Sequence, residues 1–181
     1  MMYHQPQRGF TFIETLVAIT ILVFAIVAPF YAVRQAMKAT FIARDELIAT
    51  SLAQEAVEYV RAARDSNYLY NYKNPSTPRT WMYGLDGSGG TPNCYTTNKC
   101  TIDPSASTPV VRYTSAAVVP ALYVSSSKLY NQASNGTVTR FKRTVTLTAI
   151  NVNETQVTVT VTWINHIAYT VTVTDVITNW L

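Results

Sequence analysis

The chain has 181 residues, enough for one domain of ordinary size and an additional segment. Apolar residues make up 48% of it, which excludes general disorder, whereas charged residues make up 13%, where about a quarter is usual in soluble proteins. The formal net charge of +4 is mild and does not indicate nucleic acid as the main partner.

Residues 16–33 form an uncharged apolar run that is long enough to cross a hydrocarbon core as a helix. A cleaved secretory signal is the alternative interpretation, but such a signal ends at a small-residue cleavage site. Here the chain continues with helical spacing into Arg34, Gln35 and Lys38 and shows no such site. We therefore expect the run to remain in the mature protein.

The residues just before this run form a dense motif, Gln7-Arg8-Gly9-Phe10-Thr11-Phe12-Ile13-Glu14. This segment resembles the class III leader of type IV prepilins. The resemblance implies that a prepilin peptidase cuts between Gly9 and Phe10 on the cytoplasmic side, and that the new N-terminal Phe10 is then N-methylated. It also implies that Glu14 pairs with the α-amine of a neighbouring subunit in a filament.

Glu14 is informative on physical grounds as well, because a carboxylate at the start of a membrane helix is costly and tends to be functional. Two simpler interpretations are a side chain that reaches the membrane interface and a cap for the first helical turn. The adjacent Gly9 and Phe10 favour the pairing role.

Pro29 lies within the apolar run, where it removes one backbone hydrogen bond and favours a kink or local melting of the helix. A passive kink tolerated in a membrane is the alternative. Basic residues lie on both sides of the run, at Arg8, Arg34 and Lys38, so charge does not determine its orientation. The resemblance places the leader in the cytoplasm and the C-terminal part outside.

The absence of Pro and Gly from residues 32–64, together with apolar residues at helical spacing, predicts one long helix that stops at Ser66–Asn67. Together with this helix, the resemblance implies that residues 1–9 are a cleaved leader, residues 10–33 the membrane-spanning and polymerising half of the helix, and residues 34–66 its amphipathic half. The stretch 51–62 is similar to the LAQE-x-x-E-x-x-R pattern of V-type minor pilins and I-type minor pseudopilins.

Residues 67–109 are rich in Tyr, Asn, Pro, Gly, Ser and Thr and are expected to form a variable loop region. Its aromatic side chains could contact partners in a filament or stack on a ligand, although packing of the loop onto the head is the favoured interpretation. These side chains are Tyr68, Tyr70, Tyr72, Trp81, Tyr83 and Tyr95.

The two cysteines, Cys94 and Cys100, lack the spacing and the neighbouring histidines of a zinc site. They either close a small disulfide loop, if this part of the chain is exported, or remain free thiols in a cytosolic protein. The outside location implied by the resemblance favours the disulfide.

After Pro109 the apolar pattern changes to a period of two, which indicates strands. Irregular strands are expected at 110–113 and within 116–124, the second interrupted by Pro120. Three regular half-buried strands follow at 141–149, 157–163 and 167–173, joined by tight turns at 151–153 and 165–166. Residues 110–181 thus predict an antiparallel β-sheet head against the amphipathic half of the helix, a pilin-like α+β fold.

The tightest cluster of basic residues is Arg140, Lys142 and Arg143, within this Val/Thr-rich part. Such a patch can bind nucleic acid or an anionic surface weakly. A solvated strand face is the simpler interpretation, and we favour it.

No arrangement typical of an enzyme or a metal site occurs in the sequence. His4 and His166 are the two histidines, and no Ser-His-Asp set, Cys-His pair or HExxH motif is present. A calcium site at Asp86 or Asp103 would lack the spacing of a known calcium loop. We therefore expect no catalytic residues, no cofactor and no metal.

These observations predict a structural subunit of a type IV pilus-like filament, a minor pilin that takes part in pilus assembly or initiation. Its implied partners are prepilin peptidase, other pilins or pseudopilins and an inner-membrane assembly platform. Its implied location is the cytoplasmic (inner) membrane, crossed once with the head outside, and then an extracellular or periplasmic filament. Two alternatives stay open: a minor pseudopilin of a type II secretion system, and a membrane-anchored binding domain that does not polymerise.

Overall fold

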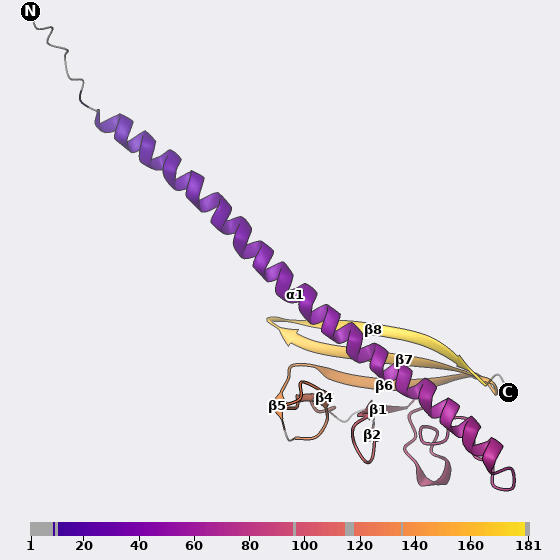
Figure 1. The fold of residues 1–181 in the computed structure, drawn as a ribbon. Helices are drawn as coiled ribbons and strands as arrows, with labels where there is room; N and C mark the ends of the chain where they lie inside the picture. The colour runs from indigo at the N-terminus through magenta and orange to yellow at the C-terminus, as the bar shows by residue number, and fades with distance from the viewer. Residues whose placement is uncertain (1–8, 10, 96, 115–117, 135, 180–181) are drawn as a thin grey trace, which may run out of the picture. The chain divides into compact units, whose positions relative to one another are not determined.

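The computed structural model describes residues 9, 11–95, 97–114, 118–134 and 136–179. The chain divides into two units, residues 1–45 and 46–181. One α-helix, α1 (Phe12–Lys73), contributes to both units, and all described strands lie in the second (Figure 1). The α+β class predicted from the sequence, a long N-terminal helix followed by antiparallel sheets, is confirmed.

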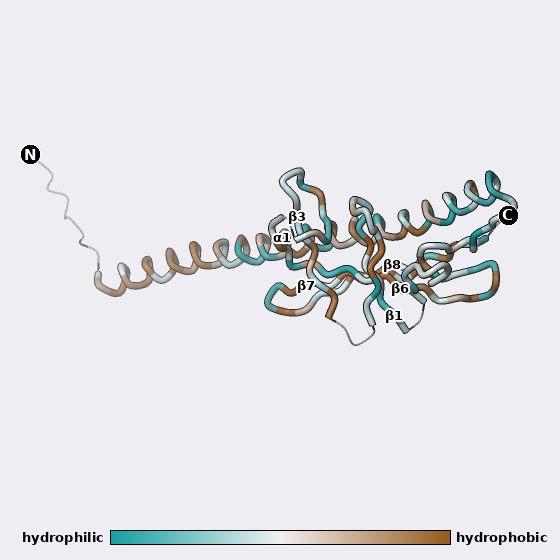
Figure 2. Tube along the Cα trace, turned by 90° about the horizontal axis from the view of Figure 1, so that it is seen from below, coloured by the Kyte–Doolittle hydropathy of each residue, from teal (hydrophilic) through white to brown (hydrophobic). Residues whose placement is uncertain are grey.

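In the first unit every side chain of α1 from Phe12 to Phe41 is exposed. Most of them are apolar, as the brown N-terminal part of the helix in Figure 2 shows. The hydroxyl groups of Thr15 and Thr20 donate to the carbonyls of Phe12 and Val17, each at 2.8 Å, so these polar groups are satisfied within the helix itself. This part of the chain has no core of its own.

In the second unit one face of α1 is buried against the sheet, along a stripe of small and apolar side chains: Ala49, Leu52, Ala53, Ala56, Val57 and Val60. The small residues allow the helix to approach the sheet closely, and the spacing of the stripe follows the helical period. The predicted stop at Ser66–Asn67 is wrong, since α1 continues to Lys73. Asn67 is buried and donates to the carbonyls of Trp81 and Tyr83, so it holds the following loop rather than ending the helix.

The main sheet has five antiparallel strands in the order β2-β1-β6-β7-β8. The predicted regular strands are confirmed as β6 (Lys142–Asn151), β7 (Glu154–Asn165) and β8 (Ile167–Thr178). The two predicted hairpins are also confirmed, with Asn151 paired to Glu154 and Asn165 paired to Ile167. His166 occupies the second turn with φ 65°, the left-handed conformation that such a tight reversal requires.

The remaining two strands of this sheet are β1 (Asn98–Ile102) and β2 (Val110–Thr114), which pair with each other along their whole length. The predicted strand at 110–113 is therefore confirmed. β1, however, lies inside the predicted loop region 67–109, and Cys100 pairs it to Val145 of β6. Interpreting all of that region as irregular was wrong.

A second, small sheet has the order β4-β3-β5, formed by β3 (Tyr123–Val124), β4 (Tyr130–Asn131) and β5 (Thr137–Val138). The predicted strand within 116–124 is thus wrong except at its end, while residues 116 and 117 lie outside the described residues. Gly136 permits the approach of β5 to β3, because a Cβ there would lie 2.3 Å from the carbonyl oxygen of Val124. A short 3-10 helix, η1 (Ser88–Gly90), precedes these elements in the loop after α1.

The main sheet has an apolar inner face and a polar outer face because side chains alternate along each strand. The inner face supplies Val145, Leu147, Val157, Val159, Val161, Trp163 and Ile177 to the core. The outer face of β6, β7 and β8 has rows of cross-strand threonines, which run Thr144–Thr160–Thr172 and Thr146–Thr158–Thr174. No charged side chain lies within these rows.

Candidate assembly site

The N-terminal motif lies at the exposed start of α1. Gly9 is exposed, whereas Phe10 lies outside the described residues, so the scissile bond and the methylated nitrogen stay predictions. Glu14 lies in the first turn, where its backbone N–H donates to the carbonyl of Thr11 at 3.1 Å. Its side chain is exposed, and no hydrogen bond or ion pair joins it to another described residue. The Glu14 carboxylate is therefore free to bind a cationic group of another molecule.

The part of α1 that follows is long and apolar enough to cross a membrane. None of its most apolar stretch is buried by the rest of the chain. The helix includes Pro29 without interruption in the single chain. Local melting at Pro29 therefore stays a prediction about the packed filament. The exposed apolar surface requires either lipid or other proteins around it.

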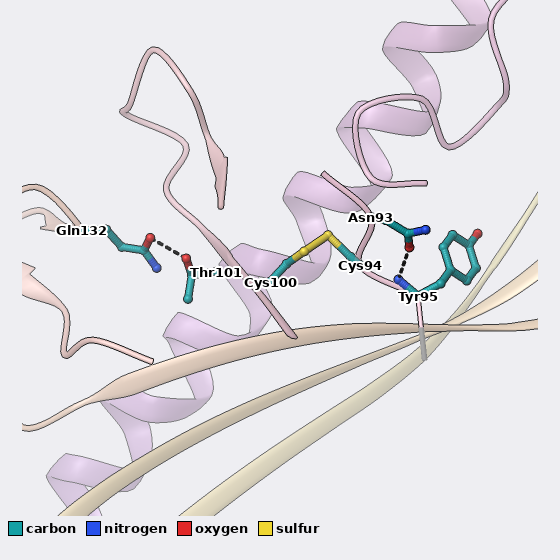
Figure 3. The surroundings of a disulfide bond; sticks show 6 residues. All are labelled: Asn93, Cys94, Tyr95, Cys100, Thr101 and Gln132. Carbon is teal, nitrogen blue, oxygen red and sulfur yellow. Dashed lines mark hydrogen bonds between the residues drawn. A yellow bond between two sulfur atoms is a disulfide. The ribbon is translucent and has the colours of Figure 1, made fainter. Parts of the chain in front are cut away.

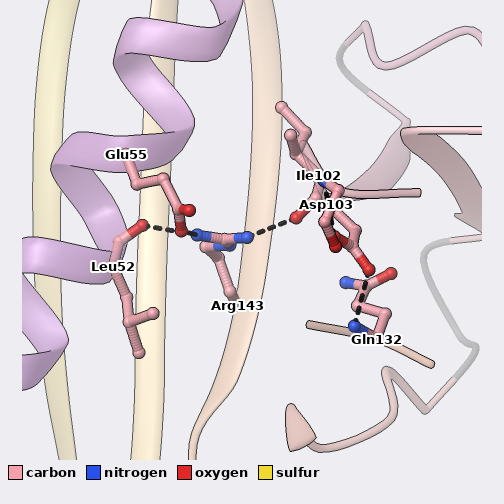
Figure 4. A network of polar contacts seen from close by, with 7 residues as sticks. Leu52, Glu55, Ile102, Asp103, Gln132 and Arg143 are labelled. Atoms are coloured by element: carbon pink, nitrogen blue, oxygen red, sulfur yellow. Dashed lines mark hydrogen bonds and ion pairs between the residues drawn. The ribbon is translucent and has the colours of Figure 1, made fainter. Parts of the chain in front are cut away.

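The head is held together by a buried guanidinium that the sequence did not indicate. Arg143 projects from β6 and is completely buried between α1 and β1 (Figure 4). Its guanidinium donates to the carboxylate of Glu55 at 2.6 Å, to the carbonyl oxygen of Leu52 at 2.8 Å, and to the carbonyl oxygen of Ile102. One side chain thus ties the helix to two strands of the sheet.

The interpretation of Arg140, Lys142 and Arg143 as a solvated strand face is wrong for Arg143. Arg140 and Lys142 are exposed, but Arg143 lies on the inner face of β6, between the core residues Phe141 and Val145. The three basic residues therefore do not form one surface patch. An anionic partner could reach two of them at most.

Asp103 follows β1 directly and fixes the loop after it. The carboxylate accepts from the backbone N–H of Gln132 at 2.8 Å and from the backbone N–H and hydroxyl of Ser105 at 3.0 and 2.6 Å. Burial by itself raises the pKa of Asp103, but these donors outweigh it, helped by the charge of Arg143, and hold the pKa below its usual range. The carboxylate of Asp86 likewise accepts hydrogen bonds from the hydroxyl of Thr80 and from the backbone N–H and hydroxyl of Ser88. Both carboxylates serve local structure.

We expect the substitution Asp103→Asn to lower the free energy of unfolding by about 1–3 kcal/mol at pH 7, because an amide accepts these donors more weakly. A carboxyl whose pKa is depressed by folding stabilises the fold above its unfolded value near pH 4, and this stabilisation disappears as pH falls through the folded pKa. The difference between parent and variant should therefore be constant above about pH 5 and shrink below about pH 4. Urea titrations from pH 7 to pH 2 measure it, and a difference that does not shrink at all between pH 4 and pH 2 would contradict this account.

The structure joins Cys94 and Cys100 in a disulfide with a Cα–Cα distance of 5.4 Å. Both sulfurs are buried beside β6 (Figure 3). The carbonyl oxygen of Cys94 accepts from the N–H of Leu147 at 2.9 Å, and Cys100 pairs with Val145. The disulfide therefore holds Cys94 and Cys100 at neighbouring positions along β6, and in this way it helps to keep β1 in the sheet.

Replacing both cysteines by Ala should lower the free energy of unfolding by about 2–3 kcal/mol, as the entropy of closing a short loop predicts. Thermal unfolding of the oxidised protein and of the double variant measures the loss. Dithiothreitol should destabilise the parent protein to a similar extent and leave the variant unchanged. Equal sensitivity of both proteins to the reductant would show that the disulfide is not the cause.

The loop that precedes the disulfide packs on the head, in agreement with the favoured interpretation of its aromatic residues. Met82 and Leu85 are buried in the core, and Trp81 and Tyr95 pack against it. The hydroxyl of Tyr95 lies 2.9 Å from that of Thr155 on β7. Tyr68 and Tyr72 differ from these residues, since both are exposed on the last turns of α1.

Residues 4–28 match the family model described as the prokaryotic N-terminal methylation motif. The match covers the leader and the start of α1, and it is consistent with a prepilin-like protein, since a leader of this kind precedes type IV pilins and pseudopilins. A leader of this class implies processing by a prepilin peptidase and assembly with pilins or pseudopilins in general, and together with the apolar helix it indicates membrane anchoring. No curated protein and no solved structure matches the chain.

Proposed function

We propose that this chain is a minor subunit of a type IV pilus-like filament and takes part in its assembly or initiation. The observation that supports this most directly is the exposed carboxylate of Glu14 at the start of the exposed apolar part of α1, within the residues that match the methylation motif. A free carboxylate is costly in such surroundings unless a cation is supplied from outside the chain.

In this proposal the apolar half of α1 holds the chain in the membrane both before and after the peptidase removes residues 1–9. Cleavage creates a positively charged α-amine at Phe10. In a bundle of such helices the low dielectric strengthens the attraction between this amine and the Glu14 carboxylate of a neighbour. Because each subunit presents one amine and one carboxylate, the contact joins two different surfaces, which is the kind of contact that a filament uses. The apolar helix surfaces leave lipid and bury one another.

The test is the intact mass of the protein after co-expression with a prepilin peptidase. We expect a chain that begins at Phe10 with one added methyl group and lacks Met1–Gly9. A peptidase with its catalytic residues removed provides the control, and there the full-length mass should remain. A full-length chain in cells that process a reference prepilin would overturn the proposal.

Three further outcomes separate the related possibilities. Cross-linking followed by mass spectrometry identifies the neighbours of the processed chain. Major pilins among them support the pilus, whereas pseudopilins of a secretion machine assign the chain to type II secretion, with which the pattern at 51–62 is equally compatible. A processed chain that is never recovered in a filament would instead indicate a membrane-anchored binding domain.

A further inference from the structure

A cavity of about 700 Å³ lies on the second unit, at the C-terminal end of α1. This volume is within the range of sites that bind small ligands. Its lining differs from the rest of the head, because it combines aromatic rings with charged and amide groups: Arg64, Asp65, Tyr68, Asn71, Arg79 and Trp81. Neither the N-terminal motif nor the proposed assembly contact uses any of these residues.

One wall of the cavity is the helix itself. Arg64, Tyr68 and Asn71 are four and three residues apart, so they lie on the same face of α1. Arg64 is fixed at the base, where Nε contacts a carboxylate oxygen of Asp65 at 2.9 Å and a terminal nitrogen donates to the carbonyl oxygen of Thr178. The long extension of α1 past the predicted stop forms this wall.

The loop after α1 contributes Arg79 and Trp81 to the lining, and asparagine side chains hold this loop against the helix. Asn71 accepts from the backbone N–H of Arg79 at 2.7 Å and donates to its carbonyl at 2.8 Å. Asn67 donates to the carbonyls of Trp81 and Tyr83 at 3.2 and 2.9 Å. These hydrogen bonds hold the helix and the loop in place without a ligand, which lowers the entropic cost of binding one.

Arg79 is held in the orientation that recognition of an anion requires. Its guanidinium carbon lies 3.6 Å from the ring centroid of Tyr70 and 4.6 Å from that of Tyr83. Among the described residues no carboxylate pairs with this guanidinium. The guanidinium is planar by its own delocalisation, and contact with the two rings restricts its position, so its N–H groups can donate in parallel to a carboxylate.

Tyr68 and Trp81 supply the apolar part of the cavity, and each also has a polar end. The hydroxyl of Tyr68 and the indole N–H of Trp81 make no hydrogen bond to a described residue. Partly exposed aromatic faces with polar ends suit a ligand that is apolar on one face and polar at its edges. A pyranose ring has this character, with C–H groups on its face and hydroxyl groups around it.

We propose that this cavity binds an acidic carbohydrate, a glycan that contains uronic acid. The sugar carboxylate pairs with Arg79, the ring lies against Trp81 and Tyr68, and Asp65 accepts from a sugar hydroxyl. A neutral glycan would leave Arg79 without a partner, and a simple polyanion would not use the aromatic faces. The site lies entirely within residues 46–181 and shares no residue with the proposed assembly contact at Phe10 and Glu14.

The test is calorimetric titration of the full chain in detergent micelles with hexagalacturonate, at fixed ionic strength. We expect saturable binding, which Arg79→Gln weakens about tenfold or more through loss of a charge-assisted pair. Arg112→Gln is the matched control, since Arg112 is an exposed arginine of β2 away from the cavity. Tyr68→Ala should also weaken binding, while Tyr72→Ala, an exposed tyrosine on the same helix end outside the cavity, should not.

Two ligand controls decide the chemical class. Methyl-esterified hexagalacturonate keeps the sugar rings but has no charge, and we expect about tenfold weaker binding or more. Hexaglutamate keeps the charge but has no sugar ring, and should not bind detectably. Equal affinity for either control, absence of binding to hexagalacturonate, or equal losses for Arg79→Gln and Arg112→Gln would each overturn the proposal. Unchanged thermal unfolding of Arg79→Gln and Tyr68→Ala confirms that any loss arises at the site.

Discussion

The substitution Arg143→Met should lower the free energy of unfolding of the head by about 2–5 kcal/mol, because it removes a buried donor from two carbonyl oxygens. Methionine fills part of the space but donates no hydrogen bond. The carbonyl oxygens of Leu52 and Ile102 then lose a buried donor, and Glu55 loses its cation. Urea unfolding followed by tryptophan fluorescence measures the change.

Lys142→Met is the matched control, because Lys142 is the exposed neighbour of Arg143 on the same strand. It should change the free energy of unfolding by no more than about 0.5 kcal/mol. Glu55→Gln should have an intermediate effect, since the Glu55 side chain is 42% exposed and water can replace part of the lost interaction. Similar effects of Arg143→Met and Lys142→Met would contradict the structural role of Arg143.

The substitution Glu14→Ala should leave cleavage of the leader intact and reduce incorporation into filaments at least about tenfold. The variant removes the carboxylate that the proposed filament contact requires, and a close charge pair in a low-dielectric setting contributes several-fold more than one in water. Incorporation is measured by quantitative mass spectrometry of sheared filaments, normalised to the processed chain in membranes.

Glu46→Ala is the control for Glu14→Ala, because Glu46 is an exposed carboxylate farther along the same helix. It should assemble like the parent chain. Glu14→Gln distinguishes charge from hydrogen bonding, and we expect it to fail like Glu14→Ala. Normal assembly of Glu14→Ala would show that filaments do not need the contact between Glu14 and the α-amine. The proposed cleavage after Gly9 would not be affected by that result.

Regular periodic patterns in the sequence predicted their elements well. The period-two runs of Val and Thr gave β6, β7 and β8, and the Asn-containing turns between them gave both hairpins. The dense motif around Gly9 and Glu14 predicted the matched leader. In each case the signal is local, because neighbouring residues determine the outcome.

The errors arose where contacts distant in sequence determine the structure. Asn67 predicts the end of the helix, because asparagine is common at helix ends. Its side-chain amide instead donates to the carbonyl oxygens of Trp81 and Tyr83, and α1 continues. β1 has no alternating pattern, because Cys100, Thr101 and Ile102 are all buried. In the sequence, the basic residues around Arg143 resemble a charged surface. In the folded chain, the Arg143 guanidinium is buried and donates to the carbonyl oxygen of Ile102 and to the carboxylate of Glu55. No single segment contains that information.

Any molecule that packs on the threonine rows of β6, β7 and β8 meets side chains that are already ordered. Threonine is stiff at χ1, particularly in a strand, so contact with these rows immobilises little that was free before. Salt screens attraction between formal charges, but the rows contain none. Contacts made on these two rows should therefore keep their strength whether the surrounding medium is dilute or saline.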